Sequence, residues 1–177
     1  IMNRLVLKRE GRLWLTYAEL DDALSISKNL RLDDQRECAI HDVSPIEALT
    51  ESFGLKGSVT YSIFVDKECI AMLGTVPYEE DNTRASVWFL GTYGIKKYYR
   101  PFLRGCKGVI DLLQGDFEEI SNVVPVEHSD TIMWLMWCGF TFSNETININ
   151  GFEMLRFVRC RNKSNNVIRI KQRPVFH

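Results

Sequence analysis

Four cations surround the predicted start of a helix in the middle of the chain. These are Lys96, Lys97, Arg100 and Arg104, and the first acidic residue after them is Asp111. Helix N-termini usually carry acids, because the helix dipole and its free N–H groups favour negative charge. Lysine as a point charge and arginine as a bidentate donor both suit phosphate. The cluster therefore indicates an anion site, and the alternative is a solvated face that pairs with nearby acids.

A few other residues could carry acid–base chemistry. His128 precedes a short apolar helix and could act as a general base, although capping that helix is the simpler role. Glu79 lies in an acidic loop, where its carboxylate could be catalytic or merely solvated. Asp34 and Glu37 share a predicted helix or turn with Arg31. They could line an acceptor site or form a structural ion pair, and we favour the structural role.

Composition narrows the class of protein. The 177 residues are 45% hydrophobic and 25% charged with a net charge of -1, which is typical of a globular protein and gives no global reason to expect nucleic acid. The five scattered cysteines favour reduced thiols in a cytosolic setting over disulfides or zinc. No apolar run is long enough to span a bilayer and the start lacks a signal-peptide core, so we expect no membrane insertion.

The hydrophobic pattern predicts an alternation of helices and strands that positions these residues. Helices are expected at 18–30, 44–53, 101–115 and 128–140, with a helix or connector at 30–42. Strands are expected at 58–66, 69–77, 85–93, 120–126, 141–150 and 152–160, and 5–17 is a strand or short hairpin. This order predicts an α/β (α+β) fold, with a mixed, mostly antiparallel central sheet and helices on both faces.

That element order resembles the GNAT N-acetyltransferase fold, whose fourth helix commonly ends in LGF, as the helix here ends in CGF. Five segments also look like a family of acetyltransferase-like proteins of T7-like bacteriophages, some of them internal virion or virion-assembly proteins. The segments are NLRLDDQRE at 29–37, AMLGTVP at 71–77, SVWFLGT at 86–92, RPFLRGCKGVIDLL at 100–113 and MWLMWCGF at 133–140. The resemblance covers roughly residues 13–159 and excludes the basic tail.

The resemblance implies an acetyl-CoA site where strands 85–93 and 120–126 open into a V. By position, the backbone of Leu90, Gly91 and Thr92 would face pantetheine. The pyrophosphate would rest on the turn that follows, a ready anion site. That turn comprises Tyr93, Gly94, Ile95, Lys96 and Lys97, and Arg100 adds a further cation.

The sequence departs from the GNAT pattern at two places. The phosphate loop of the family usually contains several glycines, whereas here Gly94 is followed by bulky side chains. Side-chain cations would then have to bind phosphate in place of the backbone. The usual opening asparagine of the fourth helix is replaced by His128, and the usual tyrosine acid by Leu135.

Two hypotheses follow from these patterns. The first is an acetyl-CoA-dependent N-acetyltransferase acting on an unknown amine or protein acceptor. The second is a catalytically silent GNAT-fold phage protein that serves virion assembly or forms an internal or tail-associated component. We expect a GNAT-like domain over 1–160 and a basic extension over 161–177, which could bind virion proteins, nucleic acid or a neighbouring subunit, or could be a frayed end. The apolar helix at 128–140 is core or a surface for a second copy in a homo-oligomer. The expected location is the host cytoplasm, or the virion.

Overall fold

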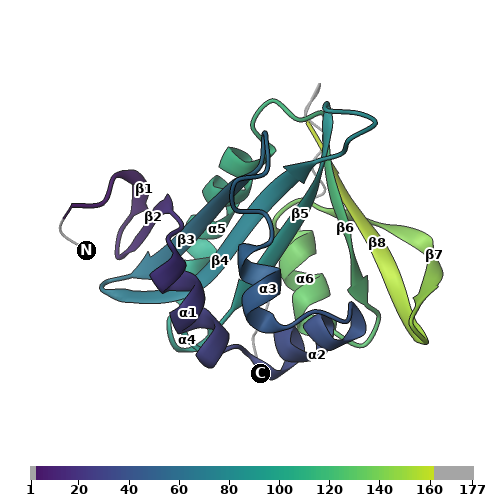
Figure 1. Cartoon of the computed structure of the whole chain (residues 1–177), viewed down its shortest axis with the longest axis horizontal. Coiled ribbons are helices and arrows are strands. Elements are labelled where there is room, and N and C mark those ends of the chain that lie inside the picture. Colours follow the sequence, from purple (N-terminus) through teal and green to yellow (C-terminus); the bar gives the residue numbers. More distant parts are fainter. Residues whose placement is uncertain (1–2, 162–177) are drawn as a thin grey trace.

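The computed structural model describes residues 3–161, in which one eight-stranded sheet carries helices on both faces (Figure 1). The strands lie in the order β1-β2-β3-β4-β5-β6-β8-β7. Neighbours are antiparallel except for β5 and β6, which are parallel. The strand bounds are β1 Val6–Glu10, β2 Leu13–Tyr17, β3 Val59–Val65, β4 Glu68–Pro77, β5 Arg84–Gly91, β6 Glu119–Pro125, β7 Thr141–Ile149 and β8 Phe152–Cys160. The predicted fold class is confirmed.

The helices divide between the two faces of the sheet. Their bounds are α1 Leu20–Lys28, α2 Leu32–Ile40, α3 Pro45–Thr50, α4 Gly94–Lys97, α5 Tyr99–Gln114 and α6 Ser129–Trp137. Helices α1, α2 and α3 lie over one face, and α5 and α6 lie over the other (Figure 1). The segment 30–42, predicted as a helix or a connector, is the helix α2. The basic extension predicted over 161–177 lies outside the described residues, apart from Arg161.

Tight turns join β1 to β2, β3 to β4 and β7 to β8. The segment predicted as a strand or hairpin at 5–17 is a hairpin, with Gly11 at a φ of 59° in its turn. The predicted turn between β3 and β4 places Asp66 at a φ of 54°. Asp and Gly enter this left-handed region more readily than other residues, which explains why the chain reverses at these positions.

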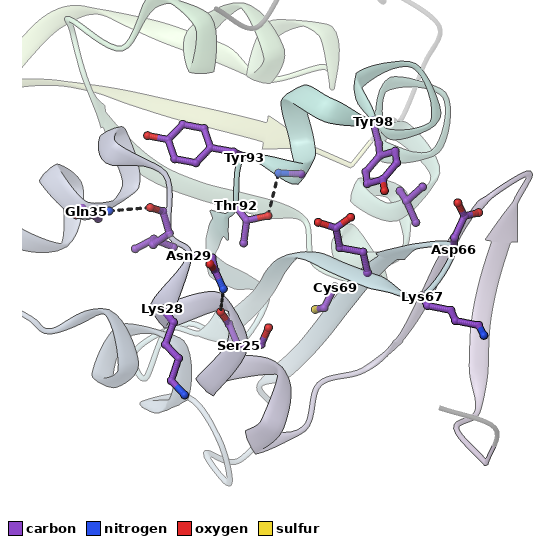
Figure 2. A pocket seen from close by; sticks show the side chains of 14 residues that line it. Ser25, Lys28, Asn29, Gln35, Asp66, Lys67, Cys69, Thr92, Tyr93 and Tyr98 are labelled. Atoms are coloured by element: carbon purple, nitrogen blue, oxygen red, sulfur yellow. Dashed lines mark hydrogen bonds between the residues drawn. The ribbon is translucent and has the colours of Figure 1, made fainter.

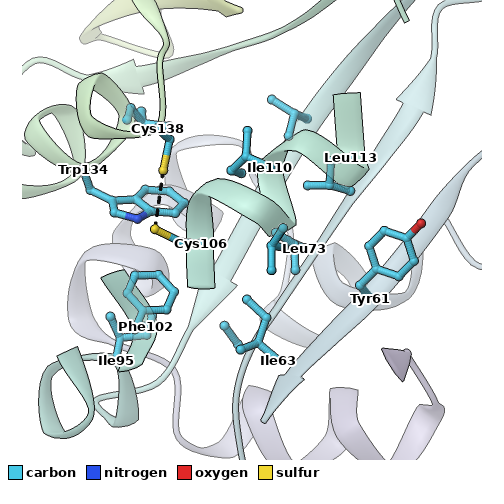
Figure 3. Close-up of a cluster of buried hydrophobic side chains, with 14 of the residues drawn as sticks. Tyr61, Ile63, Leu73, Ile95, Phe102, Cys106, Ile110, Leu113, Trp134 and Cys138 are labelled. Atoms are coloured by element: carbon cyan, nitrogen blue, oxygen red, sulfur yellow. Dashed lines mark hydrogen bonds between the residues drawn. The ribbon is translucent and has the colours of Figure 1, made fainter. Parts of the chain in front are cut away.

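The alternation of side chains along β4 divides the core into two layers. Met72 packs with Ile26 and Leu49 under α1 and α3, whereas Ala71 and Leu73 point to the opposite layer under α5. The second layer is the larger one and also takes in α6 (Figure 3). Both faces of the central strands are therefore covered, which agrees with their nearly continuous apolar sequences.

The parallel pair β5–β6 separates soon after it begins. Its ladder joins Arg84 to Glu119, Ala85 to Ile120 and Ser86 to Ser121, and no further pair follows among the described residues. Figure 1 shows the two strands diverging toward their carboxyl ends, where α2 lies close to them. This separation creates the space in which the candidate site lies.

Candidate functional site

A cavity of about 520 Å³ lies where β5 and β6 separate. Its walls come from both strands and from α2, α3 and α6. They are mostly apolar, with a few polar groups. The strands and α6 contribute Val76, Val87, Trp88, Phe89, Leu90, Asn122, Val123, Thr131, Trp134 and Leu135. The segment from the start of α2 to the end of α3 contributes Arg31, Asp34, Glu37, Cys38, His41, Val43 and Glu51. Its volume and lining are typical of a site for a small organic ligand.

Glu37 is the unusual acid of this cavity. It projects from α2 and is half-buried, and within residues 3–161 its carboxyl group has no hydrogen bond or ion pair. Burial, and then the negative charge of Asp34, raise its pKa to about 8. A carboxyl group that titrates near neutral pH in a cavity is a candidate functional group.

The neighbouring acid Asp34 has a structural role. Its carboxylate accepts two hydrogen bonds from the Arg31 guanidinium, the shorter at 2.9 Å, and is almost fully buried. It also accepts the N–H of Gly91 at 2.9 Å, while the Arg31 N–H donates to the Gly91 carbonyl at 2.9 Å. Helix α2 is thereby fastened to the outer edge of β5. Both acids line the cavity, but Asp34 forms the ion pair with Arg31 whereas the Glu37 carboxyl group has no partner in the described residues.

The remaining outer edge of β5 has one residue with free backbone groups. The antiparallel ladder directs the backbone of Leu90 toward β4, and the Thr92 N–H also donates to β4 at 2.9 Å. Val87 and Phe89 face the other way, and the Val87 carbonyl accepts the side-chain amide of Asn122 at 2.7 Å. Within residues 3–161, no hydrogen bond engages the backbone of Phe89. Phe89 is therefore the point on this edge at which a ligand could pair with the strand.

The turn after β5 borders a second, more open groove of about 1090 Å³, which lies between the α1–α2 junction and the β3–β4 turn (Figure 2). Thr92, Tyr93 and Gly94 line it. The Thr92 hydroxyl accepts the N–H of Gly94 at 3.1 Å, and the Tyr93 hydroxyl accepts the N–H of Leu32 at 3.2 Å. Ile95 is fully buried in the core. The predicted phosphate turn is thus held by its own hydrogen bonds as well as by packing.

The predicted cation cluster is exposed at the start of α5. Lys97 forms an ion pair with Glu68 at 3.2 Å, and Arg100 donates to the adjacent tyrosine hydroxyl at 3.1 Å. Lys96 and Arg104 have no polar side-chain partner within residues 3–161. Most of the positive charge at this helix start therefore remains available to an anion.

The structure does not bring the two predicted catalytic residues together. His128 is buried at the N-terminus of α6, with its Nε2 at 3.9 Å from the Asp33 carboxylate. Glu79 is exposed in the β4–β5 loop, at the amino end of β5, whereas the cavity opens toward the carboxyl end. An eight-residue strand spans about 25 Å. Neither residue lines the cavity, and their catalytic roles stay predictions.

Aromatic side chains close the cavity on the α5–α6 side. Trp134 lies at ring-centroid distances of 4.8 Å from Phe89 and 5.6 Å from Phe102, in the layer shown in Figure 3. Leu135, at the position of the tyrosine acid that the resemblance implies, also lines the cavity but has no ionisable group. The apolar helix α6 is therefore partly core, whereas Met133 and Met136 remain exposed.

The cysteines form no disulfide and belong to no metal site within the described residues. All five are free thiols, as predicted, and burial raises the pKa of Cys69 to about 12. The described residues contain no group of His, Cys, Asp and Glu that could hold a metal ion. Residues 3–161 also include no helix that is long and apolar enough to cross a membrane.

The strand order, the parallel pair that opens at its carboxyl end and the helix that follows β5 together define a GNAT-like acetyltransferase fold. Solved structures with this fold include a probable acetyltransferase, with a TM-score of 0.64 and 10% identity over 88% of this chain and 97% of that chain. The ribosomal-protein acetyltransferase RimL in complex with coenzyme A has a TM-score of 0.60 and 13% identity, over 88% of this chain and 98% of that chain. The microcin C7 self-immunity acetyltransferase MccE, in complex with acetyl-CoA and AMP, has a TM-score of 0.60 and 12% identity, over 86% of this chain and 94% of that chain.

These identities are low, so the likeness concerns the fold alone. No protein-family model matches the chain, and no curated protein matches it in sequence.

Proposed function

We propose that this protein transfers an acyl group from an acyl-CoA thioester to an amine. The observation that carries the proposal is the separation of β5 from β6, which leaves the backbone of Phe89 facing a cavity of about 520 Å³. Exposed cations stand at the start of the next helix. The similar structures of RimL and MccE hold coenzyme A and acetyl-CoA, which supports the same cofactor class here.

Acetyl-CoA fits the groups that this chain offers, with one restriction. The free N–H and C=O of Phe89 would pair with the amides of pantetheine, and Lys96 and Arg100 would neutralise the phosphates. Gly91 offers nothing to pantetheine while Asp34 and Arg31 occupy its backbone. The cofactor would therefore depend on a single strand residue and on side-chain cations.

When bound, acetyl-CoA would supply an activated acyl group: the amine nitrogen bonds to the acyl carbon, the carbon–sulfur bond breaks, and the proton lost from nitrogen balances the one gained by coenzyme A, which leaves as a thiol. The chain's own contribution is to hold and shield the reacting groups. Trp134 and Phe89 close the cavity on one side and exclude water from it. The ion pair of Asp34 with Arg31 fixes α2 as the opposite wall.

Calorimetric titration with acetyl-CoA tests the proposal. We expect binding that weakens as salt rises, because exposed cations bind phosphate through screened charges. The variant Lys96→Ala/Arg100→Ala should bind about tenfold more weakly, whereas Arg9→Ala, an exposed cation on the edge strand β1, should bind like the wild type. Absence of binding at millimolar acetyl-CoA by the folded protein would end the proposal.

A second candidate is a catalytically silent protein that retains this fold. The observation that favours it is the fastening of α2 to Gly91, which uses part of the strand edge that the resemblance assigns to pantetheine. Leu135, which stands where the resemblance implies a tyrosine acid, also favours this candidate because it cannot donate a proton. A role in a T7-like phage virion, with virion proteins as partners, rests on the sequence resemblance. The failed titration described above would favour this candidate.

A further inference from the structure

The cavity beside α2 combines mostly apolar walls with two carboxyl groups that have no partner in the described residues, the half-buried Glu37 and the exposed Glu51. Val76, Trp88 and Leu90 contribute apolar surface from β4 and β5, and Val43 contributes from the segment before α3. Glu37 enters from α2 without a partner in the described part of the chain. A ligand that fills this space therefore meets the half-buried Glu37 carboxyl group among mostly apolar side chains.

The other charged groups near Glu37 do not supply that partner. The charge of Arg31 is balanced by Asp34 at 2.9 Å, and the Asp33 carboxylate lies 3.6 Å from Arg36 and 3.9 Å from His128. The remaining titratable groups around the cavity are His41 and Cys38 from the α2 segment and Glu51 at the end of α3. Both His41 and Glu51 are exposed. The net charge that faces a ligand is therefore negative.

We propose that this cavity is the acceptor site and binds a small primary amine with an apolar body, its ammonium group paired with the Glu37 carboxylate. The inference rests on the proposed acyl transfer, since it names the acceptor class for that reaction. A mostly apolar space of about 520 Å³ fits the body of an aryl- or alkylamine. An anion would find no free cation among the cavity residues, and its charge would oppose that of Glu51.

Binding of such an amine has a proton signature. Because burial and Asp34 raise the pKa of Glu37 to about 8, this carboxyl group is mostly protonated at pH 7 in the free protein. A bound ammonium stabilises the carboxylate and lowers that pKa, so the proton passes from Glu37 to the buffer. Titrations in two buffers with different ionisation enthalpies measure the number of protons released.

Three matched probes separate charge from shape: 2-phenylethylamine, 2-phenylethanol and 3-phenylpropionate, each titrated without acetyl-CoA. We expect the amine to bind best, with release of close to one proton at pH 7, and the carboxylate not to bind. In Glu37→Gln, amine affinity should fall about ten- to hundredfold and proton release should vanish. Binding of the alcohol should be unchanged in that variant, which shows that the cavity is intact. Glu80→Gln, an exposed acid elsewhere, should behave as the wild type.

The inference is overturned if folded wild-type protein does not bind the amine, or if the amine binds Glu37→Gln as tightly as it binds the wild type. Equal affinity for the amine and the carboxylate would overturn it as well. Acetyl-CoA binding is measured separately. If the amine binds with the expected dependence on Glu37 but acetyl-CoA does not bind, the proposed amine site stands and only the proposed acyl transfer is contradicted.

Discussion

At the scale of single residues, Glu37 carries a cost in folding free energy. Its carboxyl group has an ordinary pKa of 4.5 in the unfolded chain and a pKa of about 8 in the folded one, because burial and then Asp34 disfavour its charge. The folded state consequently binds more protons than the unfolded state between these values. Stability that is present at pH 4.5 and below is lost as the pH rises toward 8.

Glu37→Gln should remove this pH-dependent loss. Below about pH 4.5 the variant and the wild type should differ little in free energy of unfolding. Above pH 8 the variant should be more stable by up to about 5 kcal/mol, since the pKa of Glu37 rises from 4.5 to about 8 and one pKa unit corresponds to about 1.4 kcal/mol. Urea unfolding at a series of pH values measures this difference. Glu80→Gln should show no such trend, and a constant difference between Glu37→Gln and the wild type from pH 4 to 9 would contradict the assignment.

The sequence identified Glu37 as a candidate residue but did not determine its role. The segment from Arg31 to Glu37 contains several acids, and both an acceptor-site role and an ion-pair role suit such a group. Which acid takes which role depends on the packing of α2 against β5, some fifty residues away in the chain. Asp34 reaches Gly91, and Glu37, one turn later, reaches the cavity. The helical spacing is visible locally, whereas the burial that changes the pKa is not.

At the scale of elements, α5 contains two glycines that have different neighbours. A Cβ at Gly105 would lie 2.8 Å from a methyl group of Leu13, which is fully buried in β2. A Cβ at Gly108 would meet only the end of the flexible Lys8 side chain. The contact with Leu13 indicates that close packing requires the glycine at position 105.

Alanine substitutions at these two positions should therefore have opposite effects. Gly105→Ala should destabilise the protein by about 1–2 kcal/mol, because overpacking against Leu13 outweighs the higher helix propensity of alanine. Gly108→Ala should stabilise it by about 0.5–1 kcal/mol, since Lys8 can move aside. Thermal or urea unfolding of the two variants measures the difference. Stabilisation by both, or destabilisation by both to the same extent, would show that the Leu13 contact is unimportant.

Local signals predicted the elements well where one short motif determines them. Ser44, Pro45 and Glu47 predict the start of α3, and the structure has the reciprocal capping bonds between Ser44 and Glu47. The predicted turn at Asp66 also forms. The sequence could not predict which backbone groups of β5 are hydrogen-bonded, because this depends on the register of β5 with β4 and on the contact of α2 with β5.

At the scale of the whole molecule, the site is assembled from distant segments. Residues 31–37, 87–90, 122–124 and 131–135 meet at the carboxyl ends of β5 and β6. The order of elements was sufficient to predict the sheet and the V between these strands. It could not predict that α2 would fasten to one strand and that aromatic side chains would close one side of the opening.

The central claim is that acyl-CoA binds along the outer edge of β5, and an NMR titration of ¹⁵N-labelled protein with acetyl-CoA tests it most directly. The amide of Phe89 should shift and its hydrogen exchange should slow at least about tenfold, together with shifts at Lys96 and Arg100. The Gly91 amide should retain its protection, because Asp34 already accepts its hydrogen bond. No shift at Phe89 with about 1 mM acetyl-CoA, or shifts confined to β1 or β7, would contradict the claim.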